Sequence, residues 1–197
     1  MSIRTFSRNK RLAAAAAIPV AVIASGVMVW QSTYSAFSAT TSNPTNNWAS
    51  GTVALSDDDS NTAMFTATAL KPGSTGTKCI AVTSTGSLPA AVKLYGTSYA
   101  TTNGLASNLN ITVDEGTGGT FASCAGFTST SNIYTGTLAS FGTTKTNFAT
   151  GVGTWTPTGT ASETKSYKIT YTLSASTPDT AQGGTAAMGF TWESQNS

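Results

Sequence analysis

Short runs in which apolar and polar residues alternate, separated by Gly, Pro and Asn, recur along the chain from residue 48 onward. Alternation with a period of two is typical of strands that bury one face of a sheet. The clearest run, 165–173, alternates Tyr, Ile, Tyr and Leu with Lys and Thr. Similar runs predict strands at 48–55, 63–70, 78–84, 90–96, 109–114 and 186–193, and a strand that passes into a short helical turn at 133–141.

About eight short strands without a convincing helix predict an all-β fold, a two-sheet jelly-roll-type β-sandwich over residues 48–197. The composition agrees with this prediction. Hydrophobic residues make up 39% of the chain and charged residues only 9%, against roughly 25% charged residues in an average soluble protein. Polarity comes from Ser, Thr, Asn and Gly instead, and the apolar fraction is high enough to form a core.

Residues 1–35 have the order of features found in a secretory signal peptide. Arg4, Arg8, Lys10 and Arg11 precede an uncharged and mostly apolar run at 12–30, which would form the signal helix. The small residue Ser35 suits a signal peptidase, and we expect cleavage between Ser35 and Ala36. The alternative is an uncleaved anchor, because the apolar run nearly reaches the roughly 20 residues that a membrane-spanning helix needs. Both alternatives place the sandwich outside the cell.

Residues 36–47 read as a flexible arm between the signal peptide and the sandwich. The segment is polar, contains Pro44 and has little to bury after Phe37. Its leading residues are Ala36, Phe37, Ser38, Ala39, Thr40, Thr41, Ser42 and Asn43.

Cys79 and Cys124 are the only cysteines, and both follow the predicted signal peptide. An even pair in an exported domain favours a disulfide. A redox-active pair is disfavoured because the chain has no Cys-x-x-Cys motif. We therefore predict a structural disulfide between Cys79 and Cys124.

The charge pattern and the missing histidine exclude several classes of protein. The formal charge of +2 hides four cations in the first eleven residues; the remaining six Lys face eight carboxylates, which leaves −2 and no arginine. Nucleic-acid binding needs clustered Lys and Arg, so we expect none here. Without histidine the chain lacks the commonest general base and zinc ligand, so we predict no enzyme, no cofactor and no catalytic metal.

Two acidic groups are candidates for chemistry. The segment Asp57-Asp58-Asp59 could bind calcium through its oxygens, but it lacks the Gly and the closing Glu of an EF-hand loop, so a solvated turn is favoured. Asp114 and Glu115 could serve as paired carboxylates with Glu163. Adjacent residues of a strand point to opposite faces, which argues against a glycosidase.

Tryptophans and lysines provide two further alternatives. Trp48, Trp155 and Trp192 could stack on sugar rings, although aromatic residues in a β-sandwich more often belong to the core. Lys78, Lys93 and Lys168 could form intramolecular isopeptide bonds, which would each lower the mass by one ammonia. Nothing in their spacing requires such bonds.

Several short motifs occur in a fixed order along the chain. The aromatic-small pair Tyr34-Ser35 precedes the expected cleavage site, and the further segments are 49–55 (ASGTVAL), 70–73 (LKPG), 83–88 (TSTGSL) and 190–196 (FTWESQN). In this order they resemble the TasA/camelysin family of secreted fibre-forming proteins. Ser74 and Thr85 depart from the family's usual acidic residue and Asn, both at turns.

The resemblance implies a subunit that is exported through a SipW-type signal peptidase and polymerises outside the cell. Each subunit would donate its arm as a strand to the next, which builds fibres of a biofilm matrix or cell surface, with other matrix components as further partners. Some relatives are labelled metalloproteases, but this chain has no HExxH motif. The alternative from another class is a monomeric exported module that binds carbohydrate or a cell-surface partner.

Overall fold

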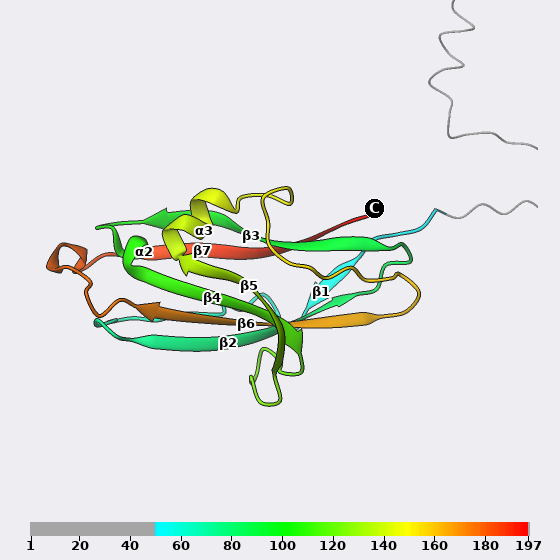
Figure 1. Ribbon diagram of the computed structural model, residues 1–197, viewed down its shortest axis with the longest axis horizontal. Coiled ribbons are helices and arrows are strands. Elements are labelled where there is room, and N and C mark those ends of the chain that lie inside the picture. The colour runs from blue at the N-terminus through cyan, green and yellow to red at the C-terminus, as the bar shows by residue number, and fades with distance from the viewer. Residues whose placement is uncertain (1–49, 197) are drawn as a thin grey trace, which may run out of the picture. The chain divides into compact units, whose positions relative to one another are not determined.

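The computed structural model describes residues 50–196, which form a unit with its own core (Figure 1). These residues contain seven strands, two α-helices and one 3-10 helix. The strands are β1 (Leu55–Asp57), β2 (Thr75–Ser84), β3 (Ala90–Thr101), β4 (Leu109–Thr117), β5 (Thr128–Thr137), β6 (Glu163–Leu173) and β7 (Ala186–Asn196). The helices are α2 (Leu105–Asn108), α3 (Leu138–Thr144) and η1 (Asp179–Ala181). The predicted signal peptide, the arm and Trp48 lie outside the described residues.

The larger sheet is antiparallel and has the strand order β1-β2-β6-β4-β5. β6 lies at its centre, between β2 and β4. On the outward face the threonines of neighbouring strands face each other, and the hydroxyls of Thr77 and Thr170 lie 3.0 Å apart. Cross-strand pairs of this kind stabilise a sheet, so part of the threonine content serves this face.

The smaller sheet contains β3 and β7, also antiparallel, with Leu94 opposite Trp192. In Figure 1 these two strands form one layer, and β2, β6 and β4 form the other. α3 contacts both β3 and β4. The hydroxyl oxygen of Thr137 caps this helix by accepting from the backbone N–H of Ser140 at 3.1 Å.

The core lies between the two sheets and follows the alternation of the sequence. Leu109, Ile111 and Val113 of β4 are buried, and their neighbours Asn110 and Thr112 are not. Other buried members of the core are Ile80, Val82, Val92, Leu94, Phe141, Tyr167, Ile169 and Leu173.

The predicted all-β fold with two sheets is confirmed, and the strands predicted at 78–84, 90–96, 109–114, 165–173 and 186–193 all exist within slightly longer ones. The strand followed by a helical turn at 133–141 is also confirmed, as β5 and α3.

Two predicted strands are wrong. In the described part of the run at 48–55 only Leu55 belongs to a strand; residues 50–54 have no regular strand pairing, although Thr52 and Ala54 accept backbone hydrogen bonds from Leu88 and Thr85. The run at 63–70 is not a strand at all, because no strand edge pairs with it in the described part of the chain.

Candidate functional site

The predicted disulfide between Cys79 and Cys124 is confirmed, with the two Cα atoms 5.3 Å apart. Cys79 lies on the outward face of β2 but is only 1% exposed, because the loop 118–127 covers it. Further contacts hold this loop on the sheet: the Ser166 hydroxyl donates to the carbonyl of Gly119 at 3.3 Å. The pair therefore attaches a loop to the sheet, as a structural disulfide does.

The acidic turn at residues 57–59 was a candidate for binding calcium, but its carboxylate oxygens accept hydrogen bonds from backbone N–H groups of the protein. The Asp58 carboxylate accepts the backbone N–H of Ala81 and that of Phe121, each at 2.8 Å. Asp59 accepts from Asn61 N at 2.6 Å. Partial burial and a side-chain hydrogen bond with Asp59 raise the pKa of Asp57, against the backbone N–H of Asp59, which lowers it. No group of three or more His, Cys, Asp or Glu is arranged to hold a metal within residues 50–196. Asp58 acts as a clamp between β2 and the loop 118–127.

Replacing this clamp should destabilise the fold measurably. We expect Asp58→Ala to lower the free energy of unfolding by about 1–2 kcal/mol, since two hydrogen bonds to a charged group are lost at an exposed site. Asp57→Ala is the matched control, because Asp57 accepts only a 3.3 Å bond from Asp59 N. Urea unfolding compares the two variants, and equal losses would contradict a clamping role for Asp58.

The three candidate catalytic carboxylates do not converge. Asp114 lies on the outward face with its oxygen 3.7 Å from Lys168 Nζ, whereas Glu115 points inward and is 1% exposed. Glu115 accepts from the backbone N–H and the hydroxyl of Thr154 at 3.0 and 3.1 Å. Glu163 pairs with Ser84 at the far end of β6. The expectation that Asp114 and Glu115 point to opposite faces is confirmed, and the described residues hold no paired carboxylates of this set.

The environment of Glu163 leads to a prediction about pH. Hydrogen bonds from the hydroxyl and backbone N–H of Thr158 hold the pKa of this carboxyl below its ordinary value of 4.5. A lowered pKa means that the ionised form stabilises the folded state above the unfolded pKa, and that this contribution is lost as the pH falls through the folded pKa. We expect Glu163→Gln to be less stable than the parent at pH 7 and equally stable at pH 2–3. A difference that does not change with pH would contradict this assignment.

The described tryptophans do not form an exposed platform for sugar rings. Trp155 is 7% exposed, and Trp192 is half-buried with its ring 5.2 Å from that of Tyr167. Burial raises the pKa of the Tyr167 hydroxyl, and the neighbouring Glu115 carboxylate raises it further. These aromatic side chains therefore belong to the core and its rim.

The three candidate lysines for isopeptide bonds have other contacts. Lys93 Nζ donates to the carbonyl of Gly153 at 2.6 Å. Lys78 and Lys168 lie over the rings of Phe121 and Phe127, at 5.2 and 5.0 Å from the centroids. Such cation–π contacts keep an ammonium in place without a covalent bond.

β7 has one paired edge and one open edge. β3 pairs with one side of it, and no backbone hydrogen bond joins the other side to any segment between residues 50 and 196. The outer edge of β3 is covered in contrast: Val92 N donates to Trp155 O at 2.9 Å, and Leu94 N donates to Val152 O at 2.7 Å. An open edge 11 residues long is a template for another strand.

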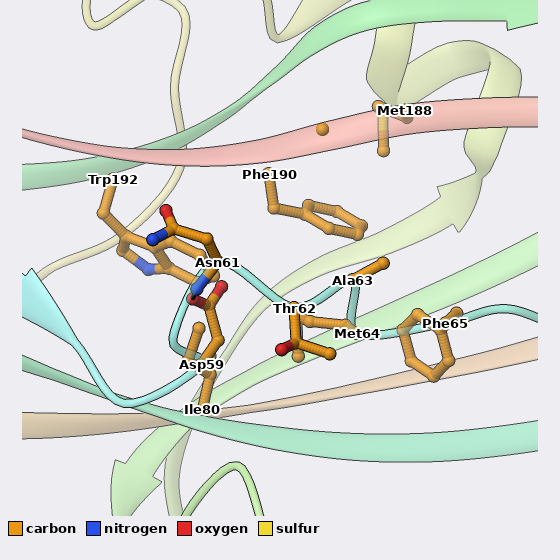
Figure 2. A pocket seen from close by; sticks show the side chains of 11 residues that line it. Asp59, Asn61, Thr62, Ala63, Met64, Phe65, Ile80, Met188, Phe190 and Trp192 are labelled. Atoms are coloured by element: carbon orange, nitrogen blue, oxygen red, sulfur yellow. Dashed lines mark hydrogen bonds between the residues drawn. The ribbon is translucent and has the colours of Figure 1, made fainter.

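A groove of about 400 Å³ lies beside β7 (Figure 2). Met188, Phe190 and Trp192 line it from β7, which confirms that these residues share one face of the strand. Ile80 of β2 and residues 59–65 form the remaining walls. Figure 2 shows the β7 side chains pointing toward this segment. Apolar side chains and an unpaired backbone edge thus occur together.

Two polar atoms on the inward face of β7 lack a hydrogen-bond partner. The indole Nε1 of Trp192 and the hydroxyl of Ser194 are both buried and unpaired with respect to the described residues. The same holds for Oε1 of Glu115. These atoms are shielded from solvent, and although burial raises the pKa of the Tyr167 hydroxyl, a side-chain interaction with Trp192 lowers it, so the indole N–H faces the core and gives no evidence for a ligand in the groove.

The sequence predicted the groove-lining face of β7 but not the groove itself. Alternation placed Met188, Phe190 and Trp192 on one face, yet it does not show whether a strand has a neighbour on both sides. The signal that could have raised the question is the run at 63–70, which has the pattern of a strand and no obvious partner.

Comparisons with known proteins add no assignment: no family model matches this chain, and no curated protein matches it either. The resemblance to the TasA/camelysin proteins therefore rests on the motifs alone. Within residues 50–196, none of the helices has the length and apolar character needed to cross a bilayer. The apolar run at 12–30 lies outside this range.

Proposed function

We propose that this chain is a secreted structural subunit that polymerises head to tail into extracellular fibres of a biofilm matrix or cell surface. Residues 36–47 of one subunit would pair with the open edge of β7 in the next. The observation that carries the proposal is this open edge, 11 residues long, beside an apolar groove. A backbone edge gives affinity through main-chain hydrogen bonds, and a groove accepts alternate side chains.

The length and chemistry of the arm suit this edge. As a strand, residues 36–43 would extend over about 26 Å, and the 11 residues of β7 extend over about 36 Å, so this edge is long enough to pair with all of them. The side chains of the arm carry no charge that the apolar groove would have to desolvate, and Phe37 has a large apolar side chain. Pro44 has no N–H to donate, so pairing should end before it and involve residues 36–43.

An added strand would enlarge the two-stranded sheet and complete a jelly-roll-type sandwich. Because the donor and the acceptor are different surfaces of one chain, the contact repeats without closing, and such contacts generate filaments.

Export supplies the free end that the proposal needs. A SipW-type signal peptidase that cuts between Ser35 and Ala36 would release the arm from the membrane segment, so assembly would start only outside the cell. The disulfide between Cys79 and Cys124 fits an oxidising compartment. The protein itself would be its main partner, with other matrix components beside it.

This function requires no catalytic side chain, metal or cofactor. Backbone pairing and burial of apolar area provide the free energy of assembly. The carboxylates of Asp114, Glu115 and Glu163 do not converge on one site. Each contacts another side chain or backbone group of the fold instead.

Electron microscopy of the chain beginning at Ala36 tests the proposal against its alternative, a monomeric exported module that binds carbohydrate or a cell-surface partner. That chain contains the whole unit that has its own core. We expect filaments of uniform width at high protein concentration. A monodisperse monomer at every concentration, measured by light scattering, would reject the fibre and favour the binding module.

A further inference from the structure

Residues 63–70 have the sequence of a strand and the surroundings of one, but they are not paired. No residue of this segment takes part in a backbone hydrogen bond with any other residue between 50 and 196. Residues 66–69 are exposed, so their backbone amides can form hydrogen bonds with water. Eight consecutive residues without backbone pairing are unusual inside a β-sandwich, where most backbone groups have a partner.

Both ends of the segment are nevertheless fixed. On one side the carboxylate of Asp58 is held by the backbone N–H groups of Ala81 and Phe121. On the other side Gly73 N donates to Leu173 O at 2.9 Å. Met64 is buried in the core, and the ring of Phe65 lies 5.2 Å from that of Tyr171. The segment is held in place by its ends and its side chains while its backbone stays unpaired.

The segment also contains local strain. Ala69 has φ of 53°, in the left-handed region where the Cβ of an alanine crowds the following carbonyl oxygen. A strand conformation would move this residue into the β region and release the strain. The present conformation is thus less favourable for the backbone than the one that the sequence pattern predicts.

The first three residues of the segment lie on the side of the groove opposite β7. Residues 63, 64 and 65 line the groove together with Met188, Phe190 and Trp192 (Figure 2). A strand that enters between them would have one backbone edge toward β7 and the other toward residues 63–70.

We infer that residues 63–70 form the second half of the acceptor site and become a strand when the arm of a neighbouring subunit, residues 36–43, enters the groove. The inference rests on the function proposed above. The arm would then pair on both sides, and the sheet would have the order β3, β7, arm and 63–70. Residues 63–70 would thus form the strand that their alternating sequence predicts in the filament, but not in the isolated subunit.

A proline at Thr66 tests this inference, with an alanine at the same position as the matched control. Thr66→Pro removes one backbone N–H that has no partner among the described residues, so the melting temperature of the monomer should change little. In the proposed sheet residues 63–70 form an edge strand, in which only alternate N–H groups face the arm, so Ala67→Pro is tested beside Thr66→Pro. One of the two prolines then removes a ladder hydrogen bond and obstructs the neighbouring strand. We expect that proline variant to abolish or greatly slow filament growth and Thr66→Ala to grow filaments as the parent does.

Hydrogen exchange provides a second measurement that does not depend on a variant. The amides of residues 63–70 should exchange quickly in the monomer, and every second one, which faces the arm, should become protected when the parent chain assembles. Filaments of the parent in which all these amides stay unprotected, or parental growth rates in both proline variants, would overturn the inference and leave the proposed fibre intact. A parent chain that forms no filaments at all would instead reject the proposed function.

Discussion

Removing residues 36–47 should abolish filaments and leave a folded monomer. The sandwich has its own core and disulfide within residues 50–196, so the truncated chain should melt at nearly the same temperature as the parent. Filament growth should fail because the acceptor edge of β7 no longer has a donor. Size-exclusion chromatography and electron microscopy measure assembly, and circular dichroism measures folding.

A synthetic peptide of residues 36–43 separates the donor role from an unspecific effect of truncation. This peptide should bind the truncated monomer and should also stop growth of parental filaments by capping the acceptor groove. A peptide in which Phe37 is replaced by Asp is the matched control and should do neither, because a charge would enter an apolar groove unpaired. Normal filaments from the truncated chain would contradict the donor role.

Replacing both cysteines by alanine should lower the free energy of unfolding by about 4 kcal/mol. The bond joins residues 45 apart in the sequence, and closing a loop of that length removes about this much conformational free energy from the unfolded chain. Because domains typically have 5–15 kcal/mol of stability, the variant should be marginal at 37 °C. Urea unfolding measures the loss.

Two controls make this result specific. The parent under strong reducing conditions should match the Cys79→Ala, Cys124→Ala variant, because both remove the same cross-link. A loss below about 1 kcal/mol in both cases would mean that the loop 118–127 is held by its other contacts, and would contradict the main stabilising role of the disulfide. The bond to Asp58 and the bond from Ser166 are the contacts that would then matter.

The fold could be predicted from the sequence wherever one face of a strand is buried. In β4 and β6 the spacing of Leu109, Ile111 and Val113, and of Tyr167, Ile169 and Leu173, corresponds to the buried positions. Burial of alternate residues involves one strand at a time, so the alternation of apolar and polar residues in the sequence indicates the buried positions directly. The disulfide could also be predicted, because the chain has only two cysteines and both follow the predicted signal peptide.

Pairing partners could not be predicted in the same way. The run at 63–70 alternates like β6, but an alternating pattern does not say whether a neighbouring backbone exists. The same limit applies to β7. Alternation predicted which of its side chains share a face, but it could not predict that one edge of the strand has no paired neighbour among the described residues. Register and contacts between distant segments, such as the bonds from Thr154 to Glu115, depend on the whole topology.

The candidate site was therefore predicted in part. The sequence predicted the proposed donor, a polar arm with a single large apolar residue at Phe37, and it predicted the apolar face of β7. The features of the proposed acceptor, an open strand edge and a groove beside it, came from the structure alone. The two halves together favour a structural role.

Residue-resolved hydrogen exchange along β7, before and after assembly, tests the central claim most directly. Every second amide of this strand points away from β3 and should exchange quickly in the monomer, while the amides that face β3 are protected. On assembly of the chain beginning at Ala36, the outward amides should become as protected as those facing β3. Filaments in which they remain unprotected, or a monomer in which they are already protected, would contradict the account.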